Sequence, residues 1–276
     1  MACNELLESI RSSHSIDDFP EGLVLPVDKP YRWTSADVIR KVKYAAIRHF
    51  GKKNLKVGHA GTLDPLATGI LLVCIGPATK RAEELQRSPK QYVAGVTFGA
   101  TTPSYDLEKE IDRFLPLDNV SEESVRNVLP SFVGEQDQVA PLFSAKSVDG
   151  VRAYETARRL LREARAAGTP FDSGDILQSS RITIYDAQLL SFGRVEFESP
   201  SPEGRINVAD ISSFDLPTAS IRVDCSKGTY IRAFARDLGE ALSSGAFLSS
   251  LRRTANGGYK IEDALLLEDI LSSLNS

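Results

Sequence analysis

The chain has 276 residues, of which 42% are hydrophobic and 25% charged, and its formal net charge is -4. This composition is typical of a globular protein and excludes one that is wholly disordered. The longest uninterrupted apolar run, residues 70–75, is far shorter than the ~20 residues of a transmembrane helix, and residues 1–10 lack the basic start and apolar centre of a signal peptide. We therefore expect a soluble cytoplasmic protein without a membrane partner.

The three cysteines, Cys3, Cys74 and Cys225, lie far apart in the sequence. Their odd number argues against a disulfide framework, and their spacing does not match a zinc site. Cysteine usage therefore favours a reducing compartment and predicts no metal.

The first elements are expected within the first fifty residues. Residues 1–22, which are rich in Ser and Asp, are predicted to form a flexible leader. Residues 23–27 have strand character, and Pro26 assigns them to a sheet edge because proline cannot donate to a ladder. Thr34 or Ser35 is a suitable N-cap for the helix that follows.

Residues 70–75 have strand length and are apolar on both faces, which predicts a central strand. Residues 91–98 alternate in polarity, as a half-buried strand does. The remaining expected elements are helices over residues 121–132, 152–166, 234–242 and 261–274, and strands or strand ends over residues 181–192, 220–224 and 228–232. Because strands and helices do not alternate regularly, the sequence predicts an α+β fold with a single domain over residues 23–276.

A basic run precedes one isolated acid. Residues 38–63 contain seven Lys or Arg and no carboxylate, and Asp64 is the only acid between residues 38 and 82. Taken alone, such a run is more often a solvated helix face than a nucleic-acid contact. These surroundings favour the charged form of Asp64, and an ionised carboxylate can act as a nucleophile or base. Asp64 is therefore the candidate reacting group.

The loop that contains Asp64, residues 58–65, is punctuated by glycines. An Asp before Pro in such a loop is commonly a turn residue, so the loop alone is weak support for catalysis. Its glycine spacing does not match a phosphate-binding loop, which disfavours nucleotide hydrolysis. A glycosidase would need a second carboxylate close by, and the surrounding sequence offers none.

A longer motif makes the chain recognisable. Residues 57–73, VGHAGTLDPLATGILLV, resemble the signature of the TruB family of tRNA pseudouridine synthases. Supporting segments follow in the family's order: residues 28–30 with Thr34 and Ser35, residues 138–146, and residues 225–232 with residues 251–253. The resemblance covers about residues 23–265 of the chain.

The resemblance implies a pseudouridine synthase fold, which has a central mixed, mostly antiparallel sheet flanked by helices and loops. It also implies a thumb-like insertion at about residues 138–180. Two departures from the family pattern are expected: residues 196–217, rich in Ser, Pro and Asp, form a longer surface excursion, and the short tail after residue 253 leaves no room for the C-terminal PUA domain of many relatives. The implied activity is conversion of uridine-55 in the T-loop of tRNA to pseudouridine, without metal or organic cofactor. The implied partner is the T-arm of tRNA, and a monomer without a protein partner is expected.

The resemblance also assigns roles to residues. Asp64 is the essential aspartate, Arg232 its counter-ion, and Tyr230 a neighbour on the same face if residues 228–232 form a strand. The expected substrate contacts are His59, Tyr92, Tyr230 and Leu251. The expected phosphate contacts are Lys29, Lys80, Arg152, Arg158 and Arg253, and for Arg253 a structural contact is an alternative.

Three points stay open at this level. Whether Asp64 attacks the sugar, attacks the uracil ring or removes a sugar proton is not decided by the sequence. Residues 102–106, TPSYD, replace a more usual Thr-Asp-Thr loop, although Asp106 still aligns with a family aspartate. An alternative function is that of an RNA-folding helper that binds and refolds tRNA and whose main role is not catalytic.

Overall fold

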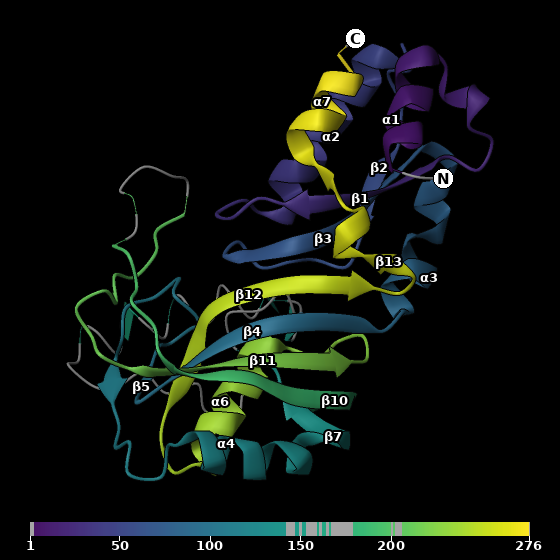
Figure 1. The fold of residues 1–276 in the computed structure, drawn as a ribbon. Coiled ribbons are helices and arrows are strands. Elements are labelled where there is room, and N and C mark those ends of the chain that lie inside the picture. The colour runs from purple at the N-terminus through teal and green to yellow at the C-terminus, as the bar shows by residue number, and fades with distance from the viewer. Residues whose placement is uncertain are drawn as a thin grey trace. The chain divides into compact units, whose positions relative to one another are not determined.

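The computed structural model describes residues 3–141, 147–148, 151–152, 159, 162–163, 166, 179–199, 201 and 206–275. The chain divides into two compact units, where the sequence had suggested one domain (Figure 1). Unit 1 comprises Met1–Tyr92 and Arg252–Ser276, and unit 2 comprises Val93–Leu251. The two boundaries fall inside strands β4 (Lys90–Phe98) and β12 (Ala246–Asn256).

The strands of unit 1 follow the order β14-β1-β3-β12, with β2 beside β3 and β13 beside the end of β12. Their bounds are β1 Leu23–Lys29, β2 Val57–Ala60, β3 Ala67–Ile75, β13 Tyr259–Lys260 and β14 Leu265–Leu266. The apolar strand predicted at residues 70–75 is confirmed as the buried end of β3. The predicted edge position of the first strand holds for residues 23–26, which pair with β3 alone, and fails at Val27, which also pairs with β14. Pro26 thus lies where the strand has one partner.

The helices of unit 1 are α1 Cys3–Ser12, α2 Ser35–His49, α3 Ala82–Arg87 and α7 Leu267–Ser273, with short 3-10 turns η1 Ile16–Asp18, η2 Gly76–Arg81 and η5 Ile261–Asp263. The cap predicted for α2 is confirmed. The Thr34 side chain accepts from the Asp37 backbone, and the Asp37 carboxylate accepts from the Thr34 backbone, which forms a capping box.

The flexible leader predicted for residues 1–22 is wrong, because most of this segment is ordered. Leu7 and Ile10 are buried, and α1 packs beside α7 (Figure 1). The ring Nε2 of His49 lies 2.8 Å from the carbonyl oxygens of Ile10 and Ser13, which ties the end of α1 to α2. The Ser and Asp content of the segment suggested flexibility, but the apolar side chains of α1 lie on one side of the helix and are buried there.

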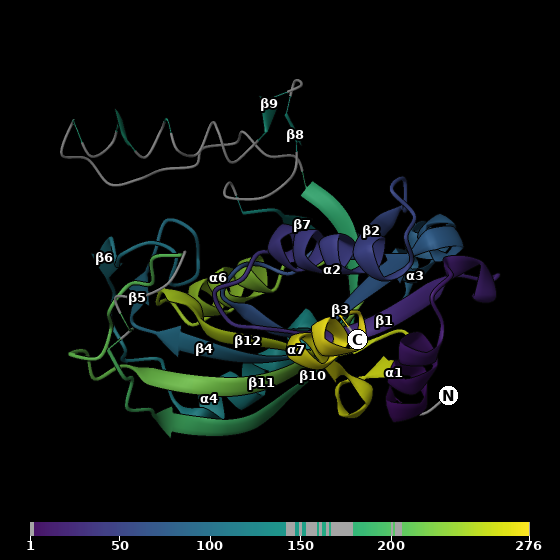
Figure 2. The same cartoon turned by 90° about the horizontal axis from the view of Figure 1, so that it is seen from above.

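The strands of unit 2 follow the order β12-β4-β11-β10-β7, and Figure 2 shows β4, β11 and β10 side by side. The bounds are β5 Ala100–Thr101, β6 Arg113–Phe114, β7 Gly134–Val139, β8 Ser147–Val148, β9 Val151–Arg152, β10 Ser179–Arg194 and β11 Pro217–Cys225. Its helices are α4 Glu122–Val128, the 3-10 turn η3 Leu129–Phe132, and α6 Ile231–Ala241. The α+β class predicted from the sequence is confirmed.

The strand predicted at residues 228–232 is wrong, because α6 begins at Ile231 and Tyr230 is its N-cap residue. Ile231, Phe234 and Leu238 are all buried, so the apolar stripe of the helix starts one turn earlier than the sequence suggested. Tyr230 and Arg232 therefore do not share a strand face.

Two predicted surface segments are only partly described. Within the excursion at residues 196–217, Ala209, Ile211 and Leu216 are buried, so this segment is packed and not simply exposed. Most of the insertion predicted at residues 138–180, including the helix expected over residues 152–166, lies outside the described residues. Among the helices that the structure does describe, none is long and apolar enough to cross a membrane.

Candidate active site

The loop before β3 has an unusually complete set of hydrogen bonds. Six successive carbonyl oxygens, those of residues 60–65, each accept a hydrogen bond or a close polar contact. The donors, in order, are Asn256 Nδ2 at 3.2 Å, Arg253 Nη2 at 3.0 Å, Arg253 Nη1 at 3.5 Å, Ser35 Oγ at 3.0 Å, Ala67 N at 3.1 Å and Lys29 Nζ at 3.1 Å. Asp64 lies in this loop with its side chain only partly exposed. The backbone that carries the candidate carboxylate is thus fixed on both sides of it.

Ser35 fixes the residue just before Asp64. Its hydroxyl oxygen accepts from the backbone N–H of Leu63 at 2.9 Å and donates to the carbonyl of the same residue at 3.0 Å. Ser35 is the first residue of α2 and is 3% exposed. The capped start of α2 therefore positions the Asp64 loop.

Arg253 is one of the largest fully buried side chains of the protein. Besides its contacts with the loop, its Nε donates to the carbonyl of Ile70 in β3 at 2.7 Å. A side chain placed at Gly69 would come within 2.2 Å of the Arg253 carbonyl oxygen, so only glycine permits this approach of the two strands. Of the two roles expected for Arg253, the structural one is supported and the phosphate contact is not, because its guanidinium is buried and bonded to the backbone.

Lys29 is also fully buried, which contradicts its predicted phosphate contact. Its ammonium donates to the carbonyls of Pro30, Trp33 and Pro65 at 2.9, 2.5 and 3.1 Å. Burial lowers the pKa of Lys29 to about 8, while attraction to Asp64 opposes this shift and repulsion from Arg253 adds to it. Lys29 is thus a structural cation that interacts electrostatically with Asp64.

The neighbouring Arg252 makes a two-pronged ion pair with Asp28. Its Nη2 and Nη1 lie 2.7 and 3.2 Å from the two carboxylate oxygens, and the Nη1 also donates to Thr68 Oγ1 at 3.2 Å. Asp28 in turn accepts from the backbone N–H of Gly69 at 3.1 Å. This pair joins β1, β3 and β12 beside the Asp64 loop.

His59 lies in β2, and burial, followed by the charge of Arg253, lowers its pKa below the usual value. Its Nδ1 is buried and has no hydrogen-bond partner in the described part of the chain. A buried ring nitrogen without a hydrogen-bond partner is uncommon in folded proteins and can mark a functional position.

The other residues of unit 1 with predicted roles differ in exposure. Tyr92 lies in β4 and is 8% exposed. Lys80 lies in η2 and is exposed, as a phosphate contact requires. The side chains of Arg152 and Arg158 lie outside the described residues.

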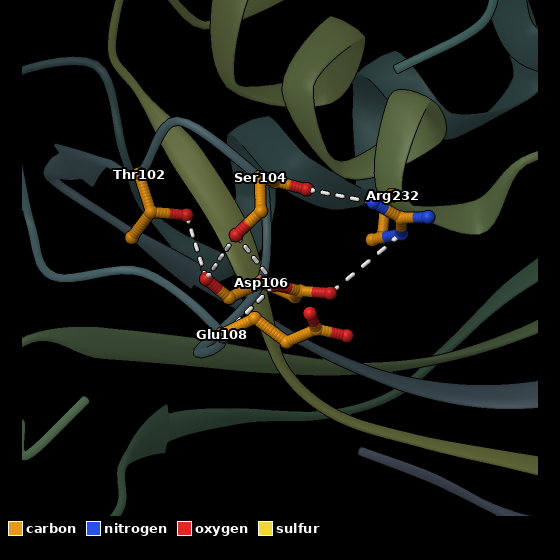
Figure 3. Close-up of polar contacts among 5 residues, drawn as sticks. All are labelled: Thr102, Ser104, Asp106, Glu108 and Arg232. Atoms are coloured by element: carbon orange, nitrogen blue, oxygen red, sulfur yellow. Dashed lines mark hydrogen bonds and ion pairs between the residues drawn. The ribbon is translucent and has the colours of Figure 1, made fainter. Parts of the chain in front are cut away.

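In unit 2, Arg232 forms a buried ion pair with Asp106. The Arg232 Nε lies 3.6 Å from Asp106 Oδ2, and both side chains are 6% exposed (Figure 3). The Nη1 of Arg232 donates to the carbonyl of Ser104 at 3.1 Å. The sequence placed Asp106 in an altered loop and gave it no role. The available signal was the presence of two hydroxyl residues, Thr102 and Ser104, just before it, because such side chains can hydrogen-bond to a nearby carboxylate or carbonyl.

The predicted partner of Arg232 was Asp64. Asp64 belongs to unit 1 and Arg232 to unit 2, so this pairing stays a prediction.

Tyr230 is held through its backbone by Gln138. The Gln138 side chain accepts from Tyr230 N at 2.8 Å and donates to Tyr230 O at 3.2 Å. Gln138 is 4% exposed and lies in β7.

Leu251, in β12, is half-buried. The described residues contain no group of three side chains that could hold a metal ion.

The architecture and motif agree with the comparisons to known proteins. Residues 48–198 match the family described as TruB family pseudouridylate synthase (N terminal domain). A tRNA pseudouridine synthase B of Phocaeicola vulgatus is 45% identical over 251 residues, covering 91% of this chain and 92% of that protein. One of Bacteroides thetaiotaomicron is 47% identical over 248 residues, covering 90% of this chain and 91% of the relative.

Among solved structures, the crystal structure of a Cbf5-Nop10-Gar1 complex matches with a TM-score of 0.60 and 25% identity. The match covers 95% of this chain and spans 57% of that one. The fold and the match over more than half the chain define a pseudouridylate synthase, which is an isomerase. The chain belongs to the TruB family.

Proposed function

We propose that this protein converts uridine-55 in the T-loop of tRNA to pseudouridine, and that Asp64 is its reacting carboxylate. The observation that carries the proposal is the loop in which the carbonyls of residues 60–65 are all bonded. A backbone fixed in this way holds one side chain in a constant position, which a reacting group requires. The family membership and the tRNA-modifying relatives support the substrate and the reaction.

The reaction needs no external reactant. The bond from uracil N1 to the ribose C1′ breaks, the uracil turns, and C5 forms the new bond to C1′. The base loses a proton from C5 and gains one at N1, so the product is an isomer of the substrate. An ionised carboxylate can serve in such a sequence as a nucleophile or as a base, and Lys29 supplies a buried positive charge near it.

A uridine in a folded loop must leave its stack before it can react, at a cost of about a few kcal/mol. Base stacking on an aromatic side chain returns about 1–3 kcal/mol. We assign the stacking to Tyr92, further base contacts to Tyr230 and Leu251, and a contact with the flipped nucleotide to His59. The partial exposure of His59 and the lack of a partner for its buried Nδ1 support a functional role for this residue.

The exposed side of α2 is the proposed docking surface for RNA. Its exposed side chains are Arg40, Lys41, Lys43, Tyr44 and Arg48. Tyr44 is 67% exposed, with the Arg48 guanidinium 5.8 Å from its ring centre. Asp37, the acid on this helix, is engaged by the N-cap and by Arg40 at 2.9 Å. A basic and aromatic surface on an otherwise acidic chain suits a polyanion.

The position of this surface supports docking of the T-arm. Ser35, at the start of α2, is bonded to Leu63 next to the reacting carboxylate. From there the helix extends to Arg48, a distance of about 20 Å at 1.5 Å per residue. Exposed Lys80 is a further proposed phosphate contact. We propose that the protein acts on the T-arm as a monomer in the cytoplasm, without metal or organic cofactor.

The test uses purified protein and an unmodified tRNA transcript, with pseudouridine mapped by carbodiimide. Wild type is expected to modify position 55, and Asp64→Asn to bind tRNA but leave it unmodified. Asp118→Asn, at an exposed loop aspartate, is the matched control with unchanged activity. An unmodified T-loop under conditions in which wild type binds the tRNA would refute the proposal. Normal function of Asp64→Asn in cells would favour RNA folding help instead.

A further inference from the structure

A tight turn precedes Asp106 in unit 2. The backbone N–H of Tyr105 donates to the carbonyl of Thr102 at 3.0 Å, and Pro103 occupies the second position of the turn, which suits its fixed φ. Tyr105 has a φ of 57°, in the left-handed region that non-glycine residues rarely adopt. Its carbonyl accepts from Leu248 N at 3.0 Å, which ties the turn to β12. The chain thus reverses immediately before the carboxylate.

Within this turn, Ser104 contacts both members of the buried ion pair. Its hydroxyl donates to Asp106 Oδ1 at 2.6 Å, and its carbonyl accepts from Arg232 Nη1 at 3.1 Å (Figure 3). The distance from Arg232 Nε to Asp106 Oδ2 is 3.6 Å, beyond ordinary hydrogen-bond length. Ser104 therefore links the guanidinium and the carboxylate through two shorter bonds.

The two bonds of Ser104 lie in the protein interior. Counted over the whole residue, backbone included, Ser104 is 1% exposed, and Arg232 and Asp106 are each 5% exposed. The Asp106 oxygen that accepts from Ser104 also accepts from the backbone N–H of Glu108 at 2.9 Å (Figure 3). In such a buried place a polar group that loses one of its partners is not compensated by water. Removing the Ser104 hydroxyl takes away the shorter of these two bonds and is thus expected to move the Asp106 carboxylate, and with it the guanidinium.

We propose that Ser104 is a positioning residue for the isomerisation: it holds Asp106 so that Arg232 presents its guanidinium in one orientation. The inference rests on the proposed function, in which Arg232 is the counter-ion of the reacting carboxylate. Ser104 acts through Asp106 and Arg232 and is not assigned a substrate contact.

Thr102 provides a matched comparison within the same turn. Its hydroxyl donates to the backbone carbonyl of Asp106 at 2.7 Å, so it holds the chain and not the carboxylate. Thr102 is also 1% exposed. Loss of this hydroxyl should weaken the turn while the bond from Ser104 to the Asp106 carboxylate remains.

The first measurement is the kinetics of pseudouridine formation with separate kcat and KM. Ser104→Ala is expected to lower kcat by about 10- to 100-fold with KM for tRNA changed by less than about 2-fold, because positioning is lost and binding is not. Ser104→Thr, which keeps the hydroxyl, is expected to restore most of the activity. Thr102→Val is expected to lower the melting temperature but kcat by less than about 3-fold.

The second measurement is a double-mutant cycle with Asp106→Ala, which removes the oxygen that accepts from Ser104. If Ser104 acts through the carboxylate, Ser104→Ala changes kcat by less than about 2-fold in the Asp106→Ala background. Additive effects, an unchanged kcat in Ser104→Ala, or a loss confined to KM would each overturn the role of Ser104. If the wild-type protein has no activity, the proposed function and the role of Ser104 are both refuted. If the wild-type protein is active and Ser104→Ala has the same kcat, only the role of Ser104 is refuted.

Discussion

Replacing Ser35 by alanine tests whether the fixed loop is needed for catalysis. The substitution removes one hydroxyl that both accepts from Leu63 N and donates to Leu63 O. Both backbone groups would then be left without these bonds at a site that is 3% exposed. Alanine fits in the space of serine, so the change removes hydrogen bonds and little packing.

The magnitude follows from the two bonds lost. Each buried backbone group without a partner costs about 1–3 kcal/mol, so the free energy of unfolding is expected to fall by about 3 kcal/mol. At about 2–4 °C per kcal/mol for a chain of this size, the melting temperature should fall by about 6–12 °C. Because Leu63 adjoins Asp64, a displacement of about 1 Å would lower kcat by about 100-fold.

The assay pairs thermal unfolding with single-turnover pseudouridine formation at a temperature where both proteins are folded. Ser121→Ala is the matched control, since Ser121 caps α4 through a bond to Ser124 N. Loss of that cap should cost about 1 kcal/mol and leave kcat unchanged. A Ser35→Ala protein that is destabilised but fully active would show that catalysis does not depend on this loop geometry.

Two further predictions concern charge. The pKa of Lys29 is about 8 in the folded protein against an ordinary 10.5, so from about pH 8 to 10.5 the unfolded chain binds more protons and stability should rise with pH, by up to about 3 kcal/mol. Urea unfolding at a series of pH values should show this rise in the free energy of unfolding for wild type but not for Lys29→Met. Lys260→Met is the control, because Lys260 is exposed, and it should behave as wild type does. The same pH dependence in all three proteins would contradict the lowered pKa of Lys29. Replacing Lys41, Lys43 and Arg48 by alanine should reduce the slope of log affinity for tRNA against log salt by about 0.7–0.9 per lost phosphate contact. Arg126→Ala, at an exposed arginine of α4, should leave the slope unchanged, and an unchanged slope in the triple variant would exclude the α2 surface from docking.

Local signals in the sequence were sufficient for several elements. The cap at Thr34 and the apolar run of β3 were predicted correctly, because a cap depends on residues three positions apart and a buried strand on its own side chains. The motif at residues 57–73 identified the family, which the comparisons confirmed. The isolated carboxylate within the motif was the natural candidate for chemistry.

Other assignments failed because they depended on distant residues. Lys29 and Arg253 had the usual appearance of surface cations, yet both are buried and bonded to backbone carbonyls. Residues 228–232 were expected to be a strand. In the structure Tyr230 has an extended backbone, and helix α6 begins at the next residue. A short segment of this kind fits either structure until its packing is known.

The sequence by itself thus determined the family, the candidate carboxylate and the basic surface of α2. Only the tertiary structure decided how the loop of Asp64 is held and which acid pairs with Arg232 in unit 2. The donors to the loop come from Lys29, Ser35, Arg253 and Asn256, positions separated by more than two hundred residues of chain. Hydrogen bonds between such distant segments form only when the chain folds, because each needs a buried donor and acceptor to be brought together.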